Sequence, residues 1–182
     1  MSHAESLPYC QIIKRDGTTA SKISGVVIEE GVILTCAHMA QSGNVEVEFH
    51  STGEKTIRSG RIVFADEDRD LAIVEVDTSG VVPVPIGEEQ PGRVKVIGFP
   101  GTKSLVTITG TIVDVGYSQN GEPRLEVDFV GQYGMSGGPV IQNSKVIGIQ
   151  IRKSDEDGVA ICASGKQIES FLLGYRKLKH SK

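Results

Sequence analysis

Tryptophan is absent from this 182-residue sequence, and the other aromatic residues are few, with five Phe and four Tyr. Cysteine is scarce too: Cys10, Cys36 and Cys162 are odd in number and widely spaced. This argues against a disulfide framework and favours a reducing compartment. No hydrophobic run approaches the roughly 18–20 residues of a membrane-spanning helix. The N-terminus lacks the basic start and apolar segment of a signal peptide. We therefore expect a cytoplasmic protein with no membrane association.

An excess of basic residues is also lacking. The 19 Lys and Arg residues and 23 Asp and Glu residues give a formal net charge of −4, which offers no reason to expect nucleic acid as a partner. With 38% hydrophobic and 23% charged residues, the composition is that of an ordinary globular protein rather than a disordered chain. The length suits one domain, or two tightly fused halves.

Glycine, in contrast, is abundant, with 22 residues. Short β-branched runs with period-two alternation recur along the chain, which is typical of an all-β protein. Hairpin turns are expected at residues 51–54 and at the Asn120-Gly121 pair. Strands are expected at residues 9–14, 23–29, 32–36, 45–50, 56–65, 71–76, 93–98, 105–115, 124–129, 140–142, 146–151 and 158–162.

Residues 78–92 interrupt this pattern with three prolines, which central strands tolerate poorly, so we interpret them as a linker. About six strands on either side of it predict two small barrels or sandwiches, one over residues 8–77 and one over residues 93–165. Apolar residues at helical spacing predict a C-terminal helix over residues 166–179. A basic cluster near its end suits the helix dipole, and we expect it to be solvated.

The segment Gly134-Met135-Ser136-Gly137-Gly138-Pro139 is the most informative stretch. A nucleophilic serine needs an exposed hydroxyl, backbone N–H groups that face a developing oxyanion, and a base. Glycines beside the serine let the backbone turn sharply and let a substrate carbonyl approach. The N–H groups of Gly134 and Ser136 are candidate oxyanion donors. The alternative interpretation is a plain glycine-rich turn, so partners for the serine must be found elsewhere.

The best candidate for the base is His38, which ends the apolar segment of residues 32–36. A histidine there would lie at the rim of a barrel, although such residues are more often structural. His3 and His180 fall near the termini, and His50 directly precedes an expected turn. His38 is therefore the only one of the four with a plausible catalytic setting.

The best candidate for a carboxylate that orients the histidine is Asp70, directly before the strand expected at residues 71–76. Such a carboxylate holds the imidazole in the correct tautomer and stabilises its charged form. Asp66, Glu67 and Asp68 are rivals, but we interpret them as solvated charges in a polar loop. Asp70 is expected to be fixed and partly desolvated.

Together these segments resemble the chymotrypsin-like serine proteases, and most closely the HtrA/DegP protease domain. The resemblance is carried by T-C-A-H at 35–38, D-R-D-L-A-I-V at 68–74 and G-M-S-G-G-P at 134–139. The order His, Asp, Ser is that of chymotrypsin-like enzymes and differs from the subtilisin and α/β-hydrolase orders. The resemblance spans roughly residues 8–175.

The resemblance implies a trypsin-like fold: two six-stranded antiparallel β-barrels and a C-terminal helix. It implies a serine endopeptidase in which Ser136 attacks the scissile carbonyl, His38 transfers the proton, and Asp70 orients His38. Gly134 and Ser136 would form the oxyanion hole. The substrate would be a polypeptide, and such enzymes need no metal or cofactor. The oligomeric state is left open.

Several positions depart from the family pattern. Met135 stands where digestive proteases carry an aspartate that pairs with a newly cleaved N-terminus, and Met39 replaces the cysteine that usually follows the histidine. No PDZ domain follows the protease-like segment, so we expect a stand-alone protease domain. A virus or phage that encodes a small relative of this fold is a possible source of the chain.

By family position, the primary specificity pocket would lack the acidic base of a trypsin-type pocket, so cleavage after a small or medium apolar residue is expected. Arg152 and Lys153 allow an alternative, acceptance of an acidic residue, although long basic side chains usually reach solvent. A different class of hypothesis is a latent or inactive protease-fold scaffold that a partner or ligand switches. The expected substrate-binding residues are Val130, Gln132, Tyr133, Ile151, Arg152, Gly158 and Ala160.

Overall fold

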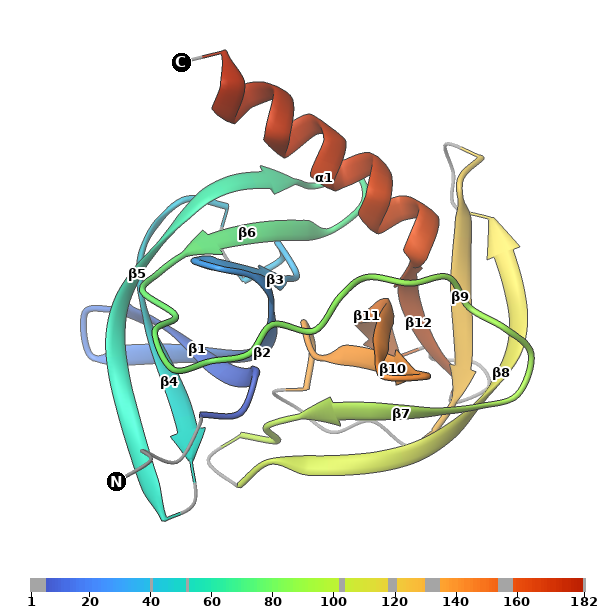
Figure 1. The fold of residues 1–182 in the computed structure, drawn as a ribbon, viewed down its shortest axis with the longest axis horizontal. Helices are drawn as coiled ribbons and strands as arrows, with labels where there is room; N and C mark the ends of the chain where they lie inside the picture. The colour runs from blue at the N-terminus through green and yellow to red at the C-terminus, as the bar shows by residue number, and fades with distance from the viewer. Residues whose placement is uncertain are drawn as a thin grey trace.

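The computed structural model describes residues 6–39, 41–51, 53–101, 104–117, 121–129, 135–153 and 159–181. Over these residues the chain forms two closed antiparallel barrels of six strands each, side by side, with one helix across them (Figure 1). The predicted all-β fold class with two barrels and a C-terminal helix is confirmed. Among the described residues, no helix is long and apolar enough to cross a membrane.

The first barrel closes in the strand order β1-β2-β3-β6-β5-β4. Its strands alternate between inward and outward side chains: in β4, Val45, Val47 and Phe49 are buried, while their neighbours are more exposed. The expected hairpin at 51–54 is present, because Ser51 pairs with Glu54. The strands are β1 (Tyr9–Asp16), β2 (Thr19–Glu29), β3 (Val32–Thr35), β4 (Gly43–Ser51), β5 (Glu54–Asp66) and β6 (Leu71–Glu75).

The second barrel closes in the order β10-β11-β12-β9-β8-β7. Strands β8 and β9 pair antiparallel on either side of the expected Asn120-Gly121 turn, although Asn120 itself lies outside the described residues. Most strands extend one to four residues beyond the predicted ends, because ladder pairing continues into the polar turns that sequence patterning excludes. The strands are β7 (Arg93–Gly98), β8 (Val106–Tyr117), β9 (Pro123–Asp128), β10 (Pro139–Gln142), β11 (Lys145–Lys153) and β12 (Val159–Ser164).

The segment between the barrels is fixed to both of them. The Val84 N–H donates to the Val27 carbonyl of the first barrel at 2.9 Å, and the Val146 N–H of the second barrel donates to the Pro85 carbonyl at 2.8 Å. The segment therefore runs along both barrels (Figure 1) and fixes their separation, rather than acting as a loose tether.

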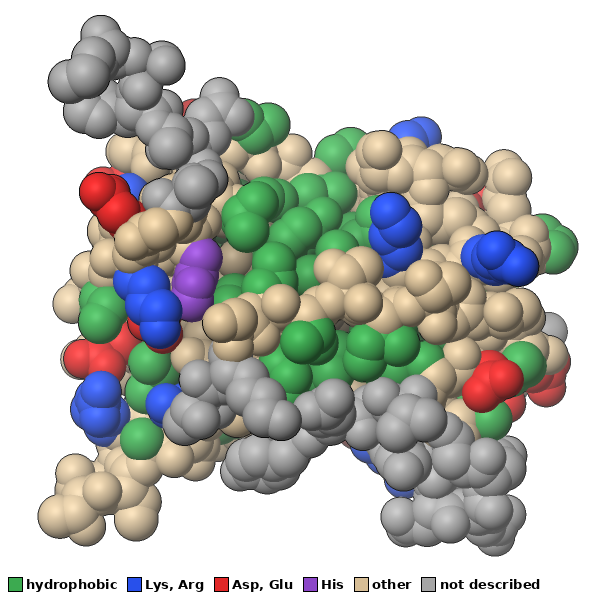
Figure 2. Space-filling view, turned by 90° about the horizontal axis from the view of Figure 1, so that it is seen from below, with side chains coloured by type: hydrophobic (Ala, Val, Ile, Leu, Met, Phe, Trp, Pro, Cys, Tyr) green, Lys and Arg blue, Asp and Glu red, His purple; other side chains and the backbone are tan. Residues whose placement is uncertain are grey.

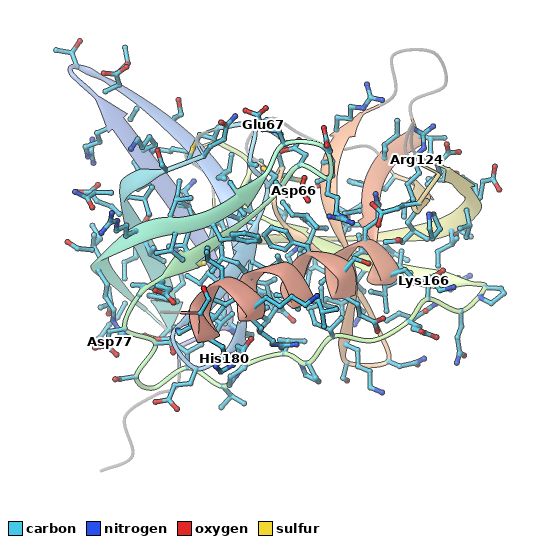
Figure 3. The ribbon with its side chains drawn as sticks, turned by 90° about the horizontal axis from the view of Figure 1, so that it is seen from above. Asp66, Glu67, Asp77, Arg124, Lys166 and His180 are labelled. Atoms are coloured by element: carbon cyan, nitrogen blue, oxygen red, sulfur yellow. The ribbon has the colours of Figure 1, made fainter. Side chains whose placement is uncertain are left out.

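Helix α1 (Gly165–His180) follows β12 directly. Its N-cap, Ser164, accepts a hydrogen bond from the Gln167 N–H, and the Gln167 side chain accepts one from the Ser164 N–H. This reciprocal capping box satisfies two helix-end donors and fixes where the helix begins. Figure 3 shows the helix running from Lys166, beside the second barrel, to His180, over the first.

The helix packs against the first barrel, although it grows out of the second. Phe171 and Tyr175 stack on Phe64 of β5, with ring centroids 5.1 and 6.0 Å apart. The Tyr175 hydroxyl donates to Glu75 of β6 at 2.5 Å, and Lys179 binds the same carboxylate at 2.8 Å. Lys179 is exposed, as expected for a solvated helix end, and helix docking also brings it an acidic partner.

Candidate active site

The turn between β5 and β6 presents Asp70 in an unusual backbone conformation, with φ of +56°. Asp66 organises this turn: its Oδ1 accepts hydrogen bonds from the N–H groups of Asp68 at 3.0 Å and Arg69 at 3.1 Å. The Arg69 guanidinium binds Asp66 at 2.7 Å and reaches Glu122 of the other half at 2.8 Å. The prediction that Asp66 is a solvated loop charge is therefore wrong, since its carboxylate shapes the turn that carries Asp70.

The structure brings Asp70 and His38 together. Asp70 Oδ2 lies 2.7 Å from His38 Nδ1, and Asp70 Oδ1 accepts a hydrogen bond from the Ala37 N–H at 2.8 Å. Both carboxylate oxygens are thus engaged by the segment that carries the histidine. The Asp70 side chain is 21% exposed and the His38 side chain 45% exposed, so the pair lies at the surface with the carboxylate on its inner side.

The second ring nitrogen of His38 faces a thiol. His38 Nε2 lies 3.8 Å from Cys36 Sγ, and Cys36 is 1% exposed. Hydrogen bonding to Asp70, and then to Cys36, raises the pKa of the His38 imidazole from 6.5 to about 10, since both contacts favour the charged ring.

Ser136 lies in the loop before β10, and its side chain is half-buried. Its hydroxyl donates to the Ile151 carbonyl at 3.3 Å, and its own carbonyl accepts from the Ser24 N–H of the first barrel at 2.9 Å. Among the hydrogen bonds between described residues, none joins Ser136 to His38. The structure therefore pairs His38 with Asp70 and holds Ser136 where the barrels meet, with its hydroxyl on another acceptor.

Two buried residues that sequence reasoning missed connect the serine loop to the histidine strand. The Thr35 hydroxyl donates to the Ser24 carbonyl at 2.7 Å, and the Ser24 hydroxyl accepts from the Phe99 N–H at 2.8 Å. Gly137, with φ of +85°, fits against both, because a Cβ there would collide with the Ser24 carbonyl and the Thr35 hydroxyl. Thr35 lies within the T-C-A-H motif, but no sequence signal marks Ser24.

Most of the expected specificity-pocket residues cannot be placed. Val130, Gln132, Tyr133, Gly158 and the expected oxyanion donor Gly134 lie outside the described residues. Of the remaining three, Ile151 and Arg152 both line the cavity beside Asp70, whereas Ala160 is buried in the core of the second barrel.

A cavity of about 500 Å³ lies beside Asp70 and is lined from both barrels and from α1. Arg152 contributes to its wall together with Arg124 and Gln167. Ligand-type atoms also gather at the histidine: Cys36, His38 and Asp70 each offer one within 4.8 Å of the others.

A histidine beyond the end of β3 pairs with a carboxylate, and a serine loop lies where two six-stranded barrels meet; together these features define a class of protein. The chain belongs to the trypsin-like peptidase domain family, whose model matches residues 23–149. The family resemblance that the sequence motifs indicate is thereby confirmed.

Within this class the chain is similar to HtrA proteins. It is 26% identical over 184 residues to serine protease HTRA1 of Xenopus laevis, with 93% of this chain and 39% of that protein covered. It is 32% identical over 131 residues to the peroxisomal leader peptide-processing protease of Mus musculus, covering 66% of this chain and 23% of that protein. The chain thus spans well under half the length of these curated relatives.

Solved structures share the fold. The active form of the Rv3671c protease from M. tuberculosis matches with a TM-score of 0.76 at 21% identity, covering 91% of this chain and 79% of that one. The inactive form of the same protease matches with a TM-score of 0.74 at 20% identity, covering 92% and 88%. The similarity in fold therefore does not distinguish an active arrangement from an inactive one.

Proposed function

We propose that this chain is a serine endopeptidase that uses Ser136, His38 and Asp70. The observation that carries the proposal is the His38–Asp70 pair, in which Nδ1 and Oδ2 lie 2.7 Å apart. The pair belongs to the first barrel, and the Ser24 N–H of that barrel also holds the Ser136 loop. Family membership over residues 23–149 supports hydrolytic chemistry. Ser136 is the half-buried nucleophile candidate, whereas the nearby Cys36 thiol, at 1% exposure, is out of reach of a substrate carbonyl.

In this proposal Ser136 Oγ attacks the scissile carbonyl while His38 Nε2 accepts its proton. Asp70 holds the Nδ1–H and stabilises the imidazolium that forms. The N–H groups of Gly134 and Ser136 stabilise the oxyanion. His38 then gives its proton to the leaving amine, and water hydrolyses the acyl-enzyme by the same steps in reverse order.

Two side chains must move before this reaction. The Ser136 hydroxyl must leave the Ile151 carbonyl, and the His38 ring must turn Nε2 from Cys36 toward Ser136. Hydrogen bonds of a catalytic site often tighten only when substrate is bound. The described arrangement therefore corresponds to a resting enzyme whose triad is completed on substrate binding.

The contacts of Ser136 with Ile151 and of His38 with Cys36 also favour a second candidate function. A protease-fold scaffold with latent activity would also hold its serine and histidine on other partners until a ligand shifts the population. The similar TM-scores for active and inactive forms of one relative leave both candidates in place.

Labelling with a fluorophosphonate separates the two candidates. The reagent phosphorylates a serine only when a base activates its hydroxyl. We expect labelling of the wild type, loss of labelling in Ser136→Ala, and normal labelling in Ser21→Ala, whose serine is exposed on β2. Absence of labelling in the presence and absence of a polypeptide substrate would identify the scaffold instead.

We propose that the enzyme cleaves after small or medium apolar residues. Figure 2 shows hydrophobic side chains gathered over the middle of one face of the molecule. Arg152 is exposed and forms part of the cavity wall beside Asp70. A peptide library tests this preference: turnover after Asp or Glu that is lost in Arg152→Gln would assign an acidic specificity to Arg152 instead.

A further inference from the structure

The three side chains Cys36, His38 and Asp70 form a group whose arrangement matches a metal site. Their ligand atoms lie within 4.8 Å of one another. Thiolate sulfur and imidazole nitrogen are the ligands that Zn²⁺ prefers, whereas Mg²⁺ and Ca²⁺ select oxygen. Cys36 is the member of this group that takes no step in the proposed proteolysis.

The spacing of the sulfur and the nitrogen fits one tetrahedral ion. Zn–S bonds of about 2.3 Å and Zn–N bonds of about 2.0–2.1 Å at a tetrahedral angle place the two ligand atoms roughly 3.6 Å apart. Cys36 Sγ and His38 Nε2 lie 3.8 Å apart. An ion that bridges them therefore requires only a small adjustment of either side chain.

Asp70 is suited to support such an ion without binding it. Its Oδ2 engages His38 Nδ1 at 2.7 Å, and its Oδ1 is taken by the Ala37 N–H at 2.8 Å. A histidine that binds a metal through one nitrogen typically donates the other N–H to a carboxylate, which fixes the tautomer and strengthens the ligand. The contact that orients a catalytic base therefore also leaves Nε2 free to coordinate.

The three cysteines differ in their surroundings, although all of them are buried and free. Among the described residues, Cys36 is the cysteine with a histidine nitrogen beside its sulfur. Cys162, also 1% exposed, is accordingly a matched control for Cys36.

We propose that Cys36 Sγ and His38 Nε2 bind Zn²⁺ or a similarly thiophilic divalent cation, and that the bound ion inhibits the protease. The Cys36 thiol and the His38 ring give their protons to solvent as the metal–sulfur and metal–nitrogen bonds form, and water completes the coordination from the exposed side of the His38 ring. An ion on Nε2 occupies the lone pair that would accept the proton of Ser136. Inhibition, unlike binding, rests on the proposed function.

Binding is tested first, in a Ser136→Ala protein that cannot cleave itself. Titration with Co²⁺ is expected to produce one equivalent of a sulfur-to-cobalt charge-transfer band in the near ultraviolet, which added Zn²⁺ displaces. Cys36→Ser on this background is expected to abolish the band, and Cys162→Ser to retain it. A band that persists in Cys36→Ser, or the absence of any band from the parent protein, would overturn the proposal.

The positioning role of Asp70 gives a second readout on binding. Asp70→Asn removes the carboxylate behind the ring, and the affinity for Co²⁺ is expected to fall about 10–100-fold, the usual effect of losing such a partner. An unchanged affinity would show that His38 is not the nitrogen ligand. Neither measurement uses catalysis, so both remain informative if the chain proves to be a scaffold.

Inhibition is tested on active protein, with each variant compared to its own uninhibited rate. Zn²⁺ is expected to inhibit the wild type and the Cys162→Ser protein reversibly, with recovery on chelation, while Mg²⁺ has no effect. The Zn²⁺ concentration for half inhibition is expected to rise at least about ten-fold in Cys36→Ser. Equal inhibition of Cys36→Ser and wild type would refute an inhibitory role for this site.

Discussion

At the scale of the residue, Asp70 both adopts an unusual backbone conformation and supplies the carboxylate that binds the histidine. Its φ of +56° lies in the left-handed region, which Asn and Asp tolerate better than most other side chains. Both carboxylate oxygens meanwhile serve the histidine segment. An alanine here would strain the backbone as well as remove the carboxylate, so only asparagine separates the two roles.

We therefore expect Asp70→Asn to fold normally and to lose about 10⁴-fold in kcat, because the amide favours the wrong tautomer of the histidine. The measurement is peptide hydrolysis, with circular dichroism to confirm the fold. Substantial activity in this variant would transfer the orienting role to another carboxylate, with Asp68 the first to examine.

His50 is a second residue whose ionisation matters, in this case for stability. Burial lowers its pKa below 6.5, with a smaller contribution from Lys55, and its ring packs on Phe99 at 4.6 Å. Because the folded state disfavours the protonated ring, the contribution of His50 to the free energy of unfolding is complete above the unfolded-state pKa. It is lost as the pH falls from that value through the folded-state pKa of His50.

The free energy of unfolding of the wild type is accordingly expected to fall as pH drops below about 6.5. His50→Gln, which cannot be protonated, should show a shallower fall over the same range. Urea midpoints at a series of pH values between neutral and mildly acidic conditions measure this. Parallel pH curves for the two proteins would contradict the assignment to His50.

At the scale of the element, the junction of β2, β3 and the serine loop is the critical unit. Thr35 and Ser24 are each 1% exposed, and the hydroxyl of one binds the carbonyl of the other. Thr35→Val keeps the shape but leaves that buried carbonyl without its hydroxyl donor, at a cost of about 1–3 kcal/mol.

The expected result for Thr35→Val is therefore a lower urea midpoint together with a lower kcat at nearly constant KM, because Thr35 ends the strand that leads to His38. Thr35→Ser restores the hydroxyl and should recover both quantities. A stability loss with kcat unchanged would show that the junction is structural only.

The elements themselves could be predicted from the sequence, because inward-facing apolar residues alternate with outward-facing residues along a barrel strand, as Val45, Val47 and Phe49 do in β4. The His38–Asp70 pairing could be predicted because both residues directly flank apolar strands. The role of Asp66 could not, because a carboxylate that binds its own turn has the same local sequence as a solvated one. Ser24 was missed for a related reason: its partners are 11 and 75 residues away.

At the scale of the whole molecule, α1 and the segment over residues 78–92 tie the barrels into one unit. The helix begins at the second barrel and buries Phe171 against Phe64 of the first. The docking of Tyr175 on Glu75, 100 residues away, could not be predicted, because an amphipathic helix reveals its apolar face but not the surface that it covers.

Because the helix packs on both barrels, Phe171→Ala is expected to lower the free energy of unfolding by about 3–5 kcal/mol. Both barrels should still unfold in one transition, because the segment over residues 78–92 also joins them. Coincident urea curves from probes in each barrel measure this. Leu173→Ala, at an exposed position of the same helix, is the control. Separate transitions in the wild type would show that the barrels are independent.

The bond from the Ser24 N–H to the Ser136 carbonyl has a consequence for the newly made chain. The loop that presents the nucleophile is held by a strand from the opposite half of the sequence, so neither half alone can assemble a working site. A nascent or partly unfolded molecule then has no competent nucleophile. Under the proposed function, activity is therefore expected only once both barrels are in place.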